Sequence, residues 1–534
     1  MSAIPHTQRA VQLVGPDELR INDTKPVCEP GPHQVLARVE ATGLCFSDLK
    51  LLKQFAAHAR KSPVASGIDA SALSQMPNYV PGDKPAVPGH ETVVRLVRAG
   101  SQVRHHRIGG RYLVQTDYRW LPTASSNAAF GYNFEGALQE YVLLDERVIV
   151  SPEGESMLIP VPEDLPASAL ALVEPWACVE NAYGEVQRRT LKDGGRLLAV
   201  AESPVDEGVL RNLPGRPAST TITTADRLDE LDDASFDDII TFGSVPETVE
   251  RLFGKLAAGG LMNIVQCGGR FDRPVVAPVG RIHYGGIRII GTTGSSPERA
   301  MLGVPVNAEI CPGDRINIIG AAGPMGSMHV IRALSEGVEG VSVFAGDLSE
   351  ERMAALRRLA VPLAEQNRIP LSLYNPAKAA PAGRFNYIAL MVPAAALVPQ
   401  AIAAAETHAI INIFAGIPAA TKIAIDLDTY IQRQLYFVGT SGSMLADMKR
   451  VLGKVVARQL DTNLLVAAVS GLDGAIDGIR AVEKNLMSGK IVVYPSCRGL
   501  PLKPLDQLGV DVPLEDGRWN GRSEEALLRL YGKE

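Results

Sequence analysis

The feature that most constrains the fold of this 534-residue chain is an internal repeat in its second half. Three pairs of segments recur at spacings of 149, 149 and 148 residues: FDDIIT at 236 with FNYIAL at 385, LMNI at 261 with IINI at 410, and IGTTGS at 290 with VGTSGS at 438. Any two α/β segments share valine, isoleucine and glycine, but the polar match of GTTGS with GTSGS favours a true repeat. We therefore predict two copies of one fold in tandem.

Each copy alternates short apolar runs with helical segments, which is typical of a parallel, doubly wound α/β sheet. RLLAV at 196 opens the first copy and RINII at 315 the second, a spacing of only 119 residues, so the first copy is shortened near its front. The first 150 residues instead hold short alternating runs, such as QVLARV at 34, which predict a β-rich, barrel-like domain. We place the domains at 1–190 completed by 465–534, at 191–304 and at 305–464.

A glycine-rich turn in the second copy has the context of a dinucleotide-binding site. It follows the strand RINII and precedes a helical segment, a second strand at 341–344 and an acidic residue. Glycines let the backbone approach a pyrophosphate, and the N-terminus of the next helix stabilises its charge. Asp347 would accept hydrogen bonds from the adenosine ribose and repel a 2′-phosphate, which favours NAD over NADP. The candidate cofactor-binding residues are Gly320, Gly323, Pro324, Met325, Gly326, Asp347 and Arg352.

The equivalent turn of the first copy reads AESPVDEG at 201–208. It lacks the early glycines and has carboxylates where phosphates would lie, so we expect no dinucleotide there. We expect this degenerate copy to have a packing role instead, covering a sheet edge or face that the second copy would otherwise offer to another subunit.

The N-terminal domain contains candidate metal ligands of three kinds. Cys45 lies in GLCFSD, His90 and Glu91 in GHE, and Glu174 in LVEPW. A thiolate, an imidazole and a carboxylate suit a catalytic zinc that keeps one position open, where it acts as a Lewis acid on an alcohol or carbonyl oxygen. Ser47, two residues after Cys45, would carry a proton away from that oxygen. A single Cys and a single His are more often core residues, so residue types alone leave this site open.

The order of these motifs resembles that of the medium-chain, zinc-dependent alcohol and polyol dehydrogenases. The motifs are CFSD at 45, GHE at 89, EP at 174, the glycine turn at 320–326 and GKIVVYP at 489, and the resemblance covers about residues 1–190 and 305–495. The chain looks most like the polyol and sugar branch, which includes sorbitol dehydrogenases and sorbose-1-phosphate reductase-like proteins, because Glu174 stands where the alcohol branch has a Cys ligand.

The resemblance implies a GroES-like catalytic domain with a Rossmann-type domain. The internal repeat adds a second Rossmann-type domain in tandem, the first of the two being truncated and degenerate, and this extra copy at about 194–300 has no place in the common family plan. It implies one catalytic zinc held by Cys45, His90 and either Glu91 or Glu174, with Ser47 as a catalytic residue. It also implies hydride transfer between NAD and a secondary alcohol or ketone of a polyol, sugar or sugar phosphate.

The N-terminal domain departs from this family pattern in several places. The four-cysteine lobe that binds a structural zinc in many relatives is absent, because residues 112–132 contain no cysteine, so we expect a single zinc. Lys50 replaces the relay histidine of many relatives and would attract an anionic substrate instead.

The spacing between Cys45 and His90 is longer than is usual in the family, and the extra residues lie at 54–80. This insertion carries Arg60 and Lys61, with Lys84 just beyond it. It is either a wall or lid of the substrate site or a solvated surface loop.

The net charge and the cysteine content limit the kinds of partner and the cellular compartment that we expect. With 53 basic and 59 acidic residues the net charge is −6, and this balance does not indicate a nucleic-acid or membrane-binding surface. Six scattered cysteines without a CxxC pair, and an N-terminus without the apolar segment of a signal peptide, predict a cytoplasmic protein. We expect a small-molecule substrate and a monomer or homodimer.

Two other functions fit the same motifs. One is an NAD-recycling lyase or epimerase that oxidises its substrate transiently and forms no net NADH. The other is a non-catalytic, redox-sensing scaffold, which need not retain stoichiometric metal.

Overall fold

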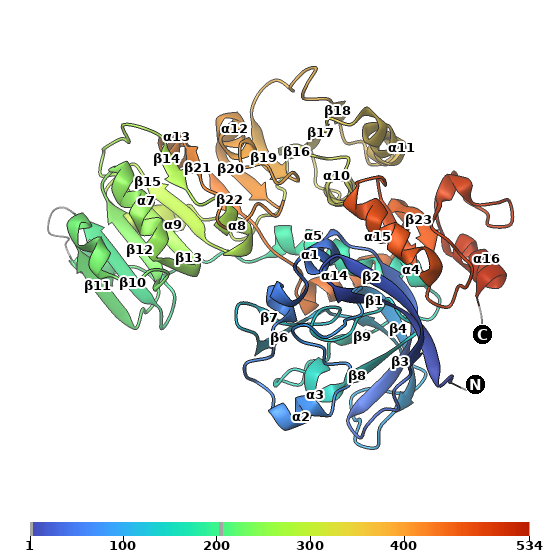
Figure 1. The fold of residues 1–534 in the computed structure, drawn as a ribbon. Coiled ribbons are helices and arrows are strands. Elements are labelled where there is room, and N and C mark those ends of the chain that lie inside the picture. Colours follow the sequence, from blue (N-terminus) through green and yellow to red (C-terminus); the bar gives the residue numbers. More distant parts are fainter. Residues whose placement is uncertain (1–3, 202–206, 533–534) are drawn as a thin grey trace. The chain divides into compact units, whose positions relative to one another are not determined.

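The computed structural model describes residues 4–201 and 207–532 (Figure 1). It divides into two compact units, Met1–Ala177 with Ser443–Glu534, and Cys178–Gly442. Most of the AESPVDEG turn falls outside the described residues. The domain limits at 190, 304 and 464 stay predictions.

The first unit is built on an eight-stranded sheet in which neighbouring strands are mostly antiparallel. Strands from the two ends of the chain are neighbours in it, because Gly43 lies opposite Val492. The C-terminal segment therefore completes the N-terminal domain. In spatial order the strands are β25 (Lys503–Pro504), β23 (Val466–Ser470), β24 (Lys490–Val493), β3 (Gln34–Gly43), β4 (Glu91–Ala99), β5 (Arg111–Val114) and β9 (Leu158–Pro160), with β8 (Tyr141–Asp145) also paired with β3.

The second unit contains two parallel sheets, one from each copy of the repeat. The first sheet has the order β11 (Ser219–Thr223), β10 (Arg196–Ala201), β12 (Phe236–Phe242), β13 (Leu256–Val265) and β15 (Arg288–Thr292). The second has the order β18 (Leu371–Tyr374), β17 (Ser342–Gly346), β16 (Arg315–Ile319), β19 (Phe385–Leu390), β20 (Ala405–Ile413) and β22 (Tyr436–Val438). Removing β18 and the helix before it, α11 (Glu350–Asn367), converts the second order into the first. The predicted tandem fold with a truncated first copy is confirmed.

The two copies pack through equivalent elements. Strand β14 (Val275–Ala277) of the first copy pairs in antiparallel fashion with β21 (Ile423–Ile425) of the second. Helix α13 (Leu427–Gln432) contacts β15 of the other copy, and its counterpart α8 (Gly280–Tyr284) contacts β22. This reciprocity is the geometry of a two-fold symmetric interface, here within one chain. The first copy therefore covers the β22 edge of the second sheet.

One hydrophobic core serves both copies. It includes Ile264 and Ile289 from the first copy and Ile411 and Phe437 from the second, all buried. The most apolar stretch of the sequence, at 388–405, forms the end of β19 and the helix α12 (Leu397–Ala404) beside this core. Within the described ranges no helix is both long enough and apolar enough to cross a membrane.

Candidate metal and dinucleotide sites

Local structure brings the CFSD and GHE motifs together. Cys45 caps the N-terminus of α1 (Phe46–Gln54), and the Asp48 carboxylate accepts a hydrogen bond from the Cys45 backbone N–H at 3.2 Å. His90 directly precedes β4, and Gly43 at the end of β3 lies opposite Glu91 at the start of β4. Because β3 leads directly to Cys45, the pairing of β3 with β4 fixes the distance between the two motifs.

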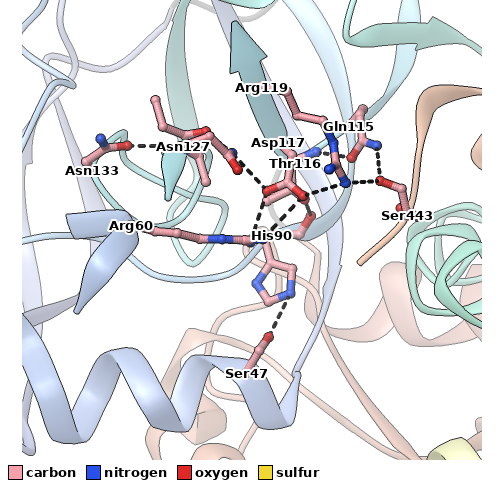
Figure 2. Close-up of polar contacts among 12 residues, drawn as sticks. Ser47, Arg60, His90, Gln115, Thr116, Asp117, Arg119, Asn127, Asn133 and Ser443 are labelled. Carbon is pink, nitrogen blue, oxygen red and sulfur yellow. Dashed lines mark hydrogen bonds and ion pairs between the residues drawn. The ribbon is translucent and has the colours of Figure 1, made fainter. Parts of the chain in front are cut away.

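The side chains of these motifs converge on His90, and Figure 2 shows its contact with Ser47. Its Nδ1 lies 3.0 Å from Asp48 Oδ1 and its Nε2 lies 3.2 Å from Ser47 Oγ, while Ser47 Oγ donates to Cys45 Sγ at 3.1 Å. Ligand atoms of Cys45, His90 and Glu91 all lie within 4.8 Å of one another. A carboxylate on Nδ1 orients an imidazole so that Nε2 faces a metal, which is the usual outer-shell arrangement of zinc-binding histidines.

Two opposing influences act on the pKa of His90. Burial alone would lower the pKa of His90, but the Asp48 carboxylate opposes that effect, and the pKa lies well above its usual value. Asp48 was not among the site residues predicted from sequence. Its position three residues after Cys45, within the first turn of a helix, was the signal that could have identified it.

Glu91 is held by a lysine from the C-terminal segment. Lys490, at the start of β24, donates to Glu91 Oε1 at 2.6 Å and to the Leu44 carbonyl at 2.8 Å, and both charged side chains are buried. Burial would lower the pKa of Lys490, but Glu91 raises it above its usual value. Glu91 Oε2 has no hydrogen-bond partner in the described part of the chain, and a Cβ on Gly43 would overlap it. Lys490 was also missed, although a lysine beside the apolar run IVV signals a buried partner.

Glu174 lies in the first turn of α5 (Val173–Gly184) and is buried. Burial raises the pKa of Glu174 to about 7, while His90 lowers it and Glu91 raises it further. These influences place Glu174 beside the same cluster, but its carboxylate is outside the group of ligand atoms within 4.8 Å of one another. Both glutamates therefore stay candidate ligands.

The C-terminal helix stabilises the segment that carries Glu174. Glu524 on α16 (Gly521–Tyr531) accepts hydrogen bonds from the backbone N–H groups of Ala167, at 2.5 Å, and Ser168, at 2.8 Å, at the N-terminus of α4 (Ala167–Ala171). The Tyr494 hydroxyl also donates to this carboxylate, at 2.9 Å. Because α4 leads directly into α5, Glu524 helps to position Glu174.

Replacing Glu524 by glutamine should lower the free energy of unfolding of the first unit by about 2 kcal/mol, because an amide N–H₂ would face backbone N–H donors. The same variant should bind zinc more weakly. Glu525→Gln is the matched control, since that side chain is exposed and its contact within the described ranges is a surface pair with Arg529. Urea unfolding curves that coincide for the two variants would contradict the role of Glu524.

In the second unit, Gly320 and Gly326 of the predicted turn each have a conformational reason. Gly320 has a φ of +83°, and the N–H groups of Gly320 and Ala321 donate to the Gly346 carbonyl. A Cβ on Gly326 would overlap the Gly320 carbonyl oxygen, so α10 (Pro324–Ser335) packs closely against β16. The nearest atom to a Cβ on Gly323 would be 3.9 Å away, so the backbone is accessible there. Pro324 and Met325 form the first turn of α10.

Asp347 follows β17, at the position expected for a residue that binds ribose. Its Oδ2 accepts the N–H of Ala322 at 3.2 Å, and its Oδ1 accepts the N–H of Ser349 at 2.9 Å and Arg352 Nη2 at 3.0 Å. The carboxylate thus joins the glycine turn to α11. Arg352, placed among the cofactor residues from sequence, contacts Asp347 directly.

Comparisons with known proteins agree with this architecture. Residues 31–153 match the family model of the alcohol dehydrogenase GroES-like domain. The chain is 24% identical over 307 residues to YphC of Escherichia coli K12, an uncharacterized zinc-type alcohol dehydrogenase-like protein, covering 54% of this chain and 78% of YphC. It is 26% identical over 248 residues to the uncharacterized protein YggP of the same organism, covering 41% of this chain and 57% of YggP. The sorbitol dehydrogenase of Bos taurus is 30% identical over 115 residues, covering 22% of this chain and 26% of that enzyme.

Solved structures confirm the fold class. The crystal structure of 2R,3R-butanediol dehydrogenase from Bacillus subtilis superposes with a TM-score of 0.52 and 16% sequence identity, covering 92% of this chain and all of that one. At this identity the likeness concerns the fold alone. With the GroES-like domain match, it confirms the prediction of a GroES-like domain joined to Rossmann-type structure.

Proposed function

We propose that this chain, which is related to the medium-chain, zinc-type alcohol dehydrogenases, transfers a hydride between NAD and a secondary alcohol or ketone of a polyol, sugar or sugar phosphate. The observation that carries the proposal is the convergence of Cys45 Sγ, Ser47 Oγ and His90 Nε2, with Asp48 on the other imidazole nitrogen. A histidine with only a packing role does not require a thiol and a hydroxyl beside one of its ring nitrogens, whereas a metal-binding histidine does have other ligand groups there.

The residues present suit zinc. Cys45 and His90 would hold the ion together with Glu91 or Glu174, and the donor set of thiolate, imidazole and carboxylate is typical of catalytic zinc. Bound zinc would polarise the substrate oxygen as a Lewis acid. Ser47 Oγ lies between Cys45 Sγ and His90 Nε2, within hydrogen-bond reach of both, which suits it to carry a proton to or from the substrate oxygen. The missing four-cysteine lobe supports one zinc per chain.

The glycine turn at 320–326 would bind the pyrophosphate of NAD at the N-terminus of α10, whose backbone N–H groups and dipole favour negative charge. Asp347 would accept hydrogen bonds from the adenosine ribose. The acidic side chain supports NAD over NADP because a 2′-phosphate would lie beside a carboxylate.

Asp347→Asn should reduce the preference for NAD over NADP about 10-fold or more, because it removes the charge that repels a 2′-phosphate and weakens the contact with ribose. The measurement is kcat/KM for both cofactors with one substrate. The Ala322 and Ser349 N–H groups donate to different oxygens of Asp347, and asparagine offers only one acceptor oxygen, so the variant should also lose about 1–2 kcal/mol of stability. An unchanged cofactor ratio would refute the assignment.

The polyol and sugar substrate class is supported by Glu174, which stands where the alcohol branch has a Cys ligand, and by the match to a sorbitol dehydrogenase. The decisive experiment is a screen of polyols, sugars and their phosphates for NADH formation, with zinc measured on the same preparation. Retained NAD without net NADH would instead indicate a recycling lyase or epimerase. Protein without stoichiometric zinc would indicate a scaffold.

A further inference from the structure

One wall of the candidate metal site carries two arginines on a single buried carboxylate. Asp117, at the start of β6 (Asp117–Pro122), lies next to Thr116, whose hydroxyl donates to the His90 carbonyl at 3.4 Å. The charge of Asp117 also contributes to the raised pKa of Glu174. Asp117 is therefore beside the metal ligands, although nothing in the sequence motifs assigns it a role.

The two arginines reach Asp117 from different segments (Figure 2). Arg60, in the insertion at 54–80, makes a two-pronged contact, with Nη1 3.0 Å from Oδ1 and Nη2 3.3 Å from Oδ2. Arg119 lies two residues after Asp117 on β6 and so on the same face of the strand, with its Nη2 3.6 Å from Oδ2 and donating to the Ser443 carbonyl at 3.2 Å. Asp117 is 5% exposed, whereas Arg60 and Arg119 are 23% and 46% exposed.

Aromatic contacts connect this wall to the metal ligands. The Arg60 guanidinium lies over the Tyr132 ring at 5.3 Å, and the Tyr132 ring is 5.7 Å from that of His90. The ring of His58, which also belongs to the insertion, has its centroid 5.2 Å from that of the Tyr132 ring. Burial, followed by the charges of Arg60 and Lys50, lowers the pKa of His58 to about 4, so cationic side chains already gather around it.

The wall gathers two cationic side chains. The guanidiniums of Arg60 and Arg119 meet at the one carboxylate of Asp117, and each guanidinium carries five N–H donors. A neutral polyol needs no second arginine there. Planar guanidiniums held in a fixed orientation are the groups that proteins use to bind phosphate and carboxylate.

We propose that Arg60 and Arg119, oriented by Asp117, form a subsite for an anionic group of the substrate, a phosphate monoester or a carboxylate, beside the candidate metal ligands. The inference rests on the proposed function, because it assumes that the substrate lies next to Cys45 and His90. It narrows the substrate class from polyols in general to their phosphorylated or oxidised, acidic derivatives. Asp117 is a positioning residue, since it acts through the two arginines.

The test uses zinc-loaded protein without NAD, so that binding is measured without turnover. Calorimetric titrations compare an alditol, its phosphate monoester and the corresponding aldonate. We expect at least one of the two anions to bind 10-fold or more tightly than the neutral alditol, and the tighter anion identifies the anionic group. Arg60→Met and Arg119→Gln should each reduce that preference about 10-fold.

Matched variants separate binding from folding. Arg98→Gln removes the same charge from an exposed surface pair with Glu29 and should change nothing. Arg60→Lys retains the charge but not the two-pronged geometry, so its affinity for the anion should lie between those of wild type and Arg60→Met. Arg119→Gln keeps the proposal testable if Arg60→Met fails to fold, because Arg119 does not lie in the insertion.

Equal affinity for the alditol and both anions, or an anion preference unchanged in both Arg60→Met and Arg119→Gln, would overturn the subsite. The binding experiment and the test for NADH formation can fail separately. Anion selectivity that depends on the arginines, in a protein that forms no NADH, would uphold the subsite and refute the dehydrogenase. If both variants formed NADH from neutral polyols as fast as the wild type and neither changed the anion preference, the dehydrogenase would be upheld and the subsite refuted.

Discussion

Cys45→Ser should lose zinc and dehydrogenase activity together, with activity falling by more than about 100-fold, the upper range for loss of an outer-shell partner of a metal ligand. A serine hydroxyl is a far weaker zinc ligand than a thiolate. His90 would be left with only carboxylate co-ligands, and Ser47 would lose the sulfur to which it donates.

Zinc content by elemental analysis and NADH formation should be measured on the same samples of the Cys45 variant. Cys28→Ser is the matched control, because Cys28 belongs to the same unit but is outside the cluster of metal-binding atoms. A Cys45→Ser protein that kept stoichiometric zinc would exclude Cys45 as a ligand and with it the proposed site.

Lys490→Met should lower the free energy of unfolding of the first unit by about 3–5 kcal/mol, because it leaves the Glu91 carboxylate buried without its cation. The double variant with Glu91→Gln should regain much of that loss, since it removes the uncompensated charge. The comparison requires zinc-free protein, because a metal would compete with Lys490 for Glu91.

Tryptophan fluorescence isolates the relevant unit, because Trp120, Trp176 and Trp519, the three tryptophans of the chain, all belong to the first unit. Denaturant unfolding followed by this signal therefore measures the unit that contains the ion pair. A loss below about 1 kcal/mol, as for a surface ion pair, would mean that the pair is hydrated in solution.

Much of the fold was predictable because it is encoded in local patterns. The repeat spacing predicted two similar sheets, and the shorter first spacing predicted a missing piece, which the structure identifies as β18 and α11. The glycine turn and the CFSD and GHE motifs are short and continuous. Their residues could therefore be named before their contacts were known.

What could not be predicted depends on contacts between distant positions. Glu524 and Ala167 are 357 residues apart, and Lys490 and Glu91 are 399 apart, so no local pattern joins them.

The burial of Lys61 could not be predicted from sequence for the same reason. The sequence offered it as a cation of the insertion, but it is fully buried and donates to the carbonyls of Val80 and Lys84, and burial lowers its pKa to about 8. The charge that faces the site comes from Arg60, its neighbour.

The pairing of β14 with β21 gives the nucleotide folds a property that separate subunits lack. Partners joined by peptide bonds meet at a fixed local concentration, so dilution does not separate them, whereas an obligate dimer dissociates as its protomers become scarce. Selection for a cofactor turn need act on only one member of such a tethered pair. The other copy is then free to diverge in sequence. If the first copy binds no dinucleotide, as the turn at 201–208 predicts, saturation would require one dinucleotide for every two folds.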